Sequence, residues 1–162
     1  MTQKAEFNAE EWSTILEGAP TAAMIVIAAG KGGTIRESMS IGKAYAAEQQ
    51  NADNTELLDA IVKDRPELDV KQYADPNDLP TVGMARVKAA LETLETKGTP
   101  AEAEDFKRFV YTVAHTAAEA HKEGGFLGIG GTRVSEKEAE ALQKLAETLE
   151  YDAPPLEPTE ES

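Results

Sequence analysis

Cysteine is absent from this chain, histidine occurs only twice, and aromatic residues make up 6% of it. Without cysteine, disulfides, thiolate metal sites and thiol nucleophiles are excluded. No basic segment followed by an apolar run occurs at the N-terminus, so we expect no signal peptide. The longest apolar run, Ala19 to Ala29, is shorter than the roughly 20 residues that a membrane span requires. These absences predict a soluble, cytoplasmic protein.

Positive charge is also scarce. The chain has 16 basic and 30 acidic residues, a net charge of −14, and residues 101–162 alone carry 6 basic and 14 acidic groups, or −8. A negative field of this size repels phosphate backbones and anionic lipids. The composition therefore argues against nucleic acid and membrane surfaces as partners and favours cations or basic proteins. The plainer interpretation is that the acids keep the protein soluble.

The length and composition are those of a single folded domain. The chain has 162 residues, of which 41% are hydrophobic and 28% charged. Residues 153–162 differ, because they contain three prolines and three acids and have little to bury. We therefore predict one helical domain over residues 1–152 and a disordered acidic tail over residues 153–162.

The spacing of apolar residues predicts an all-α fold, a compact bundle of about seven helices. A residue that can accept hydrogen bonds, followed three positions later by an acid, marks the start of five of them. These pairs are Asn8/Glu11, Thr34/Glu37, Asp53/Glu56, Thr99/Glu102 and Ser135/Glu138. The helix after Thr99 carries the widest apolar stripe, formed by Phe106, Phe109, Val110, Val113, Ala114 and Ala117.

The first two helices are expected to be short and separate. Gly18 ends the first, Pro20 suits the first turn of the second, and Gly30 is predicted to close it in a left-handed conformation. The run Met24 to Ile27 could also form a buried strand. The alanines around it, and the lack of a second strand-like run to pair with, favour a helix.

Two glycine-rich segments separate predicted helices. Residues 123–135 hold five of the twelve glycines, and residues 30–37 form a smaller version of the same pattern. Gly-Gly-Thr occurs in both, 98 residues apart, which fits either two related helical halves or chance. The longer segment also carries the large apolar residues Phe126, Leu127 and Ile129. They could cover the core as a lid, or form an exposed tip that docks a partner.

No residues with a recognisable catalytic spacing occur in the sequence. Lys31 is followed by glycine, so the phosphate-binding pattern G-x-x-x-x-G-K-[ST] is not met. His115 and His121 lie six residues apart, about 120° from a common helix face, and neither belongs to a zinc motif. We expect His115 to be a hydrogen-bonded packing residue, and the protein not to be an enzyme.

Residues 28–37, 118–125 and 135–149 resemble the TerB-like tellurite-resistance proteins, through an alanine-rich helix, a glycine turn and an acid-capped helix. The resemblance implies an all-helical, seven-helix fold built from two related halves. It also implies a role in stress or tellurite resistance, with metal ions bound at acidic turns. The acids at matching positions are Glu37, Glu123, Glu136 and Glu138. Carboxylates are suitable ligands for a divalent cation.

Two functions from different classes follow from these patterns. The first is a non-enzymatic helical interaction module in a stress-response assembly, which would use the segment from Phe126 to Ile129 to dock a protein partner. The alternative is a metal-ion sensor or buffer that binds a divalent cation through the acidic turns. An enzyme with a pocket between the two halves is the least favoured alternative. The sequence identifies neither the partner nor the oligomeric state.

Overall fold

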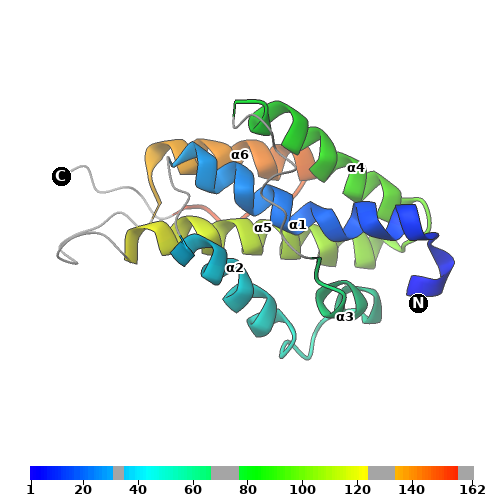
Figure 1. Ribbon diagram of the computed structural model, residues 1–162. Coiled ribbons are helices and arrows are strands. Elements are labelled where there is room, and N and C mark those ends of the chain that lie inside the picture. Colours follow the sequence, from blue (N-terminus) through cyan, green and yellow to red (C-terminus); the bar gives the residue numbers. More distant parts are fainter. Residues whose placement is uncertain (31–34, 67–76, 124–133, 157–162) are drawn as a thin grey trace.

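The computed structural model describes residues 1–30, 35–66, 77–123 and 134–156 of the chain (Figure 1). Within the described helices, the side chains of residues 35–38 and 121–123 are also left out. The predicted cap at Thr34 therefore lies outside the described residues.

The all-α class is confirmed, since the described residues form six α-helices and no strand. The helices are α1 (Ala9–Ala29), α2 (Ile35–Glu48), α3 (Glu56–Lys63), α4 (Met84–Glu95), α5 (Pro100–Glu123) and α6 (Glu136–Leu149). A 3₁₀ turn, η1 (Lys4–Glu6), precedes α1, and a π-helical turn, η3 (Leu79–Gly83), leads directly into α4.

Helices α1 and α5 run side by side through the middle of the molecule (Figure 1). Helices α4 and α6 lie on one side of this pair, and α2 and α3 on the other. The most extensive contacts of α1 are with α5 and α4, and α2 packs mainly on α5. The core therefore forms around α1 and α5, and every other helix covers part of that pair.

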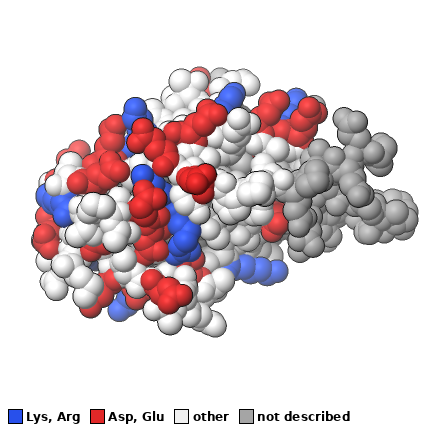
Figure 2. Space-filling view, turned by 180° about the vertical axis from the view of Figure 1, so that it is seen from behind, with Lys and Arg blue, Asp and Glu red and all other residues white. Residues whose placement is uncertain are grey.

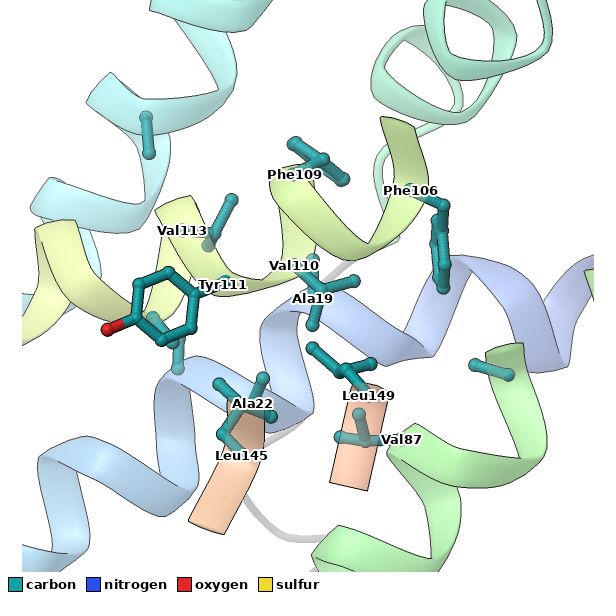
Figure 3. Close-up of a cluster of buried hydrophobic side chains, with 14 of the residues drawn as sticks. Ala19, Ala22, Val87, Phe106, Phe109, Val110, Tyr111, Val113, Leu145 and Leu149 are labelled. Atoms are coloured by element: carbon teal, nitrogen blue, oxygen red, sulfur yellow. The ribbon is translucent and has the colours of Figure 1, made fainter. Parts of the chain in front are cut away.

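The apolar stripe predicted on α5 is confirmed, because all six of its residues are buried. Figure 3 shows how the layers meet: Val110 of α5, Ala19 of α1 and Leu149 of α6 converge on one point. Small residues on α1 let the larger side chains of its neighbours approach closely. Burial of apolar surface at this junction is the main stabilising term of the fold.

Helix α1 is continuous, so the prediction that Gly18 ends a first helix and Pro20 begins a second is wrong. A Cβ on Gly18 would lie 3.0 Å from the Cβ of Ala90 and 3.1 Å from Cζ of Phe106. The glycine is thus needed for close packing and does not terminate the helix. Pro20 interrupts the hydrogen-bond ladder, and its burial among the helices compensates for that loss.

The segment from Met24 to Ile27 is helical, as its flanking alanines favoured. Because this segment belongs to a helix of 21 residues, the apolar run alone underestimates the length of the helix. Among the described residues, one helix, α1, is long and apolar enough to cross a membrane, with a mean hydropathy of 1.3. Within the fold, 61% of that apolar window is buried by other parts of the chain. Core helices of soluble proteins pass the same test.

Three of the predicted helix starts are confirmed by reciprocal hydrogen bonds between the cap and the acid three residues later. The pairs are Asn8/Glu11, Thr99/Glu102 and Ser135/Glu138. The prediction that Asp53 caps α3 is wrong, because Thr55 occupies that position and accepts from the N–H of Leu58 at 3.3 Å. Asp105 of α5 fixes Thr55 by accepting from both its N–H and its hydroxyl, each at 2.9 Å.

Candidate functional site

The two ends of helices that border the glycine-rich segments meet in space. Helix α1 ends at Gly30, and the first turn of α6 places Glu138 directly against it. Gly30 has φ −79° and ψ 4°, so the predicted left-handed cap is wrong. A Cβ at this position would lie 2.0 Å from Oε1 of Glu138. Residue 30 must therefore lack a side chain for the end of α1 to lie this close to Glu138.

Glu138 is fully buried, at 0% exposure. Its Oε2 accepts from the N–H of Ser135 at 2.9 Å, and its own N–H donates to the Ser135 hydroxyl at 3.3 Å. Its Oε1 has no hydrogen-bond partner among the described residues. A buried carboxylate oxygen without a partner is costly, so this oxygen is the one at this junction available to bind a further group.

The other predicted ligands do not gather around Glu138 in the described part of the chain. Glu136 is exposed, and its position two residues before Glu138 places it on another side of α6. Glu37 lies in α2 and Glu123 at the end of α5, with side chains outside the described residues. Among the residues that are described, no three potential ligands form a metal-binding group.

The predicted docking segment cannot be placed against this junction. Phe126, Leu127 and Ile129 all fall in residues 124–133, outside the described residues. Both of its interpretations, as a lid over the core or as an exposed tip, therefore stay predictions.

A groove of about 520 Å³ lies where the chain turns back after α6. The turn is made by Glu150, whose φ of 50° is left-handed, and by the N–H of Tyr151, which donates to the carbonyl of Ala146 at 2.9 Å. Tyr151 then packs on Tyr111 of α5, with ring centroids 5.5 Å apart and planes tilted by 49°. Ala153 and Leu156 pack against the core, so the start of the predicted tail follows the helices.

The ring of Tyr111 connects this groove to the core. Tyr111 is 6% exposed, and Figure 3 shows it projecting from α5 near Leu145 of α6. Burial, and secondly the nearby Tyr151, raise the pKa of its phenol, so the hydroxyl is neutral at physiological pH. His115 also stacks on the Tyr111 ring, with ring centroids 6.1 Å apart. Its Nδ1 lies 3.8 Å from Oε1 of Glu119. That distance is too long for a hydrogen bond between these two atoms.

A charged network around Arg108 lies between α5 and the connection from α2 to α3. Its guanidinium donates to Oε1 of Glu48 at 2.5 Å, to Asp105 at 2.9 Å and to Asn54 at 3.2 Å. The hydrogen bond to Glu48 is the main reason that the pKa of Arg108 is raised. The network joins three elements and leaves the groove and the Gly30 junction apart from it.

The sequence analysis does not predict the groove, because its two tyrosines are 40 residues apart and Tyr151 lies between the last predicted helix and the predicted tail. The available signal was Tyr151 itself, an aromatic residue set among acids and prolines that a solvated tail does not need. No family model, no curated protein and no solved structure matches the chain.

Proposed function

We propose that this chain is a non-catalytic helical interaction module that binds a positively charged protein partner. The groove beside α5 and α6 carries the proposal, because it is open, about 520 Å³ in volume and bordered by Glu147, Glu150 and Asp152. Acidic side chains also outnumber basic ones on the face drawn in Figure 2. With a net charge of −14, the molecule would attract and steer a basic partner.

The titrating groups with displaced pKa values support a role without catalysis. The pKa of Glu11 is lowered mainly by a hydrogen bond from Lys97, and that of Asp64 mainly by one from Lys4. Both contacts link segments far apart in the sequence. The shifts of these two carboxyl groups follow contacts that hold the fold together, and the pKa of Tyr111 in the groove is raised mainly by burial.

The resemblance to TerB-like proteins adds a cellular role to the proposal, namely stress or tellurite resistance in the cytoplasm. Its support is the all-α fold together with the contact between Gly30 and Glu138, which brings the borders of both glycine-rich segments to one place. Two related halves packed at their turns would produce such a contact.

Site-specific photo-crosslinking tests the interaction directly. A photoreactive amino acid at Gln143, an exposed residue of the groove, should yield an adduct with a defined protein in cells that express the chain. The same group at Ser13, an exposed neutral residue of α1, is the matched control. The captured protein should carry a net positive charge, and its affinity for the purified chain should fall as salt rises. Equal adducts from both positions, or an affinity indifferent to salt, would contradict the proposal.

Cation binding is the second candidate function, and the unpartnered Oε1 of Glu138 favours it. A hard divalent cation takes carboxylate and carbonyl oxygens as ligands, and the carbonyl end of α1 lies beside this carboxylate. Glu138 would supply one ligand of such a site.

Thermal unfolding with millimolar calcium, magnesium or manganese tests this second function. A cation at about 100 times its dissociation constant would stabilise the fold by roughly 2.7 kcal/mol. Glu138→Gln, which can keep the helix cap, should abolish the shift, whereas Glu136→Gln on the exposed face should leave most of it. A shift that survives Glu138→Gln would place the cation elsewhere, and no shift with any cation would reject the function.

A further inference from the structure

Two tyrosine rings in contact with each other line the groove after α6. Tyr111 is held by the core, and Tyr151 is held by the hydrogen bond from its N–H to Ala146 and by ring contact at 5.5 Å. Both residues line the groove, and Tyr151, which is half-buried, is the more accessible of the two rings. The π face of a tyrosine carries partial negative charge and attracts cations that lie within about 6 Å of its centre.

Carboxylates border the same groove. Glu147, Glu150 and Asp152 all line it and all are exposed, and its described lining contains no lysine or arginine. The local sequence strengthens this bias, because residues 143–162 contain six acids and only Lys144 as a base, a net charge of −5. A cation in the groove would thus meet tyrosine rings and several carboxylates, and a phosphate or carboxylate ligand would be repelled.

The backbone at Glu150 sets the direction in which the chain leaves α6. Among the described residues it is the single non-glycine residue with positive φ. Glycine or asparagine usually fills such a position after a helix. Strained backbone of this kind gathers at functional sites. Here the strained residue is also one whose carboxylate lines the groove.

We propose that this groove binds an organic cation, an alkylammonium or guanidinium group, against the ring of Tyr151 beside Tyr111, with Glu147, Glu150 and Asp152 as counter-charges. Such a group can come from a free quaternary ammonium compound or from a lysine or arginine side chain of a protein. A lysine or arginine side chain as the ligand would rest on the proposed interaction module. A free quaternary ammonium compound would be independent of it. A hydrated divalent cation fits less well, because aromatic rings cannot replace its oxygen ligands.

Nuclear magnetic resonance titration of the full chain with choline tests the site. The amide signals of residues 146–153 should shift in a saturable way. Its uncharged carbon analogue, 3,3-dimethylbutan-1-ol, has nearly the same shape and should bind at least tenfold more weakly. This comparison uses the unaltered protein, so it does not depend on any variant folding. Equal shifts with both compounds, or no saturable shift with either, would overturn the proposal.

Substitutions then assign the binding to these residues. Tyr151→Leu keeps an apolar side chain but removes the ring, and should weaken choline binding about tenfold. Asp152→Asn should weaken it a few-fold, as expected for an exposed charge. Glu95→Gln, an exposed acid on α4, is the control and should have no effect. Unchanged affinity in Tyr151→Leu, with circular dichroism showing an intact fold, would refute the aromatic site.

Peptides distinguish the two sources of the cation. A short peptide with one lysine or arginine should compete with choline if a protein side chain is the natural ligand, and its acetyl-lysine counterpart should not. Choline binding without such competition would assign the groove to a free cation. Cross-linking at Gln143 does not require a cation in the groove, so its success together with a failed choline titration would reject only this inference and leave the interaction module standing.

Discussion

At the scale of single residues, Gly30 and Gly42 should respond in opposite ways to the same substitution. A Cβ at Gly30 would meet Oε1 of Glu138 at 2.0 Å, and Ser135 holds that carboxylate in place. Gly42 lies inside α2, where the nearest atom is on the guanidinium of Arg65 at 3.5 Å. We expect Gly30→Ala to lower the free energy of unfolding by about 1–3 kcal/mol. Gly42→Ala should raise it by about 0.5–1 kcal/mol. Chemical denaturation measures both changes.

Removal of the clashing carboxylate provides the control. In a Glu138→Ala background, Gly30→Ala should lose most of its cost, because the atoms that it strikes are gone. The effect of Gly42→Ala should be the same in both backgrounds, since distant sites are additive. A cost of Gly30→Ala that persists without the carboxylate would show that the contact between α1 and α6 is not its cause.

The two glycines in and after α1 also show where prediction from sequence fails at this scale. The sequence predicts that Gly18 and Gly30 each end a helix, because glycine often occupies the position after the last helical residue. Both are instead required by side chains from remote segments, Phe106 and Ala90 in one case and Glu138 in the other. Sequence shows that a residue lacks a side chain, and only the packing shows which neighbour fills the space.

At the scale of the helix, starts were predictable where their signal lies within one turn. The pairs Thr99/Glu102 and Ser135/Glu138 form their reciprocal hydrogen bonds because both partners are local. The start of α3 was misplaced because Asp105, 50 residues away, orients Thr55 as the cap. The sequence around Asp53 does not reveal this contact between Thr55 and Asp105.

The cap of α5 should make stability depend on pH. Burial alone would raise the pKa of Glu102, but hydrogen bonds from Thr99 and from the N–H of Thr2 outweigh it and keep the pKa below 4.5. A carboxyl group with a lower pKa in the folded state stabilises above its unfolded pKa and loses this effect as the pH falls through the folded value. Glu102→Gln should therefore cost about 1 kcal/mol at neutral pH.

As the pH falls below 4.5 and through the lowered pKa of folded Glu102, the difference between Glu102→Gln and the unaltered chain should shrink, because Glu102 then becomes protonated. Denaturation curves collected from neutral to acidic pH would follow the change. Glu95→Gln, at an exposed position of α4, should run parallel to the unaltered chain throughout. A constant difference between Glu102→Gln and the unaltered chain at all pH values would mean that the charge of Glu102 is not what stabilises the cap.

At the scale of the whole molecule, the class of the fold was predictable and the sites were not. Helical spacing and burial agree because each amphipathic helix turns its apolar face to the pair α1 and α5. The groove depends on a turn that brings Tyr151 to Tyr111, and the acidic junction depends on two helix ends that meet. Among the acids predicted as ligands, the sequence could not tell that Glu138 is buried and Glu136 is exposed.

The network around Arg108 should be the most sensitive polar connection between α5 and the side of the bundle formed by α2 and α3. Glu48, at the end of α2, is 6% exposed and accepts from this guanidinium at 2.5 Å. Arg108→Ala should lower the free energy of unfolding by about 3 kcal/mol, because it leaves the carboxylate of Glu48 buried without its partner. Arg108→Lys keeps the charge but not the planar fork, and should cost about 1 kcal/mol.

An exposed ion pair provides the comparison for this network. Lys88 lies 3.9 Å from Glu92 on the surface of α4, so Lys88→Ala should change stability by less than about 1 kcal/mol. A double-mutant cycle of Arg108→Ala with Glu48→Ala should then give a coupling energy above about 1 kcal/mol, since the second substitution removes the stranded charge. Coupling near zero would mean that α2 and α5 are held together by apolar packing alone, with Arg108 as a dispensable surface contact.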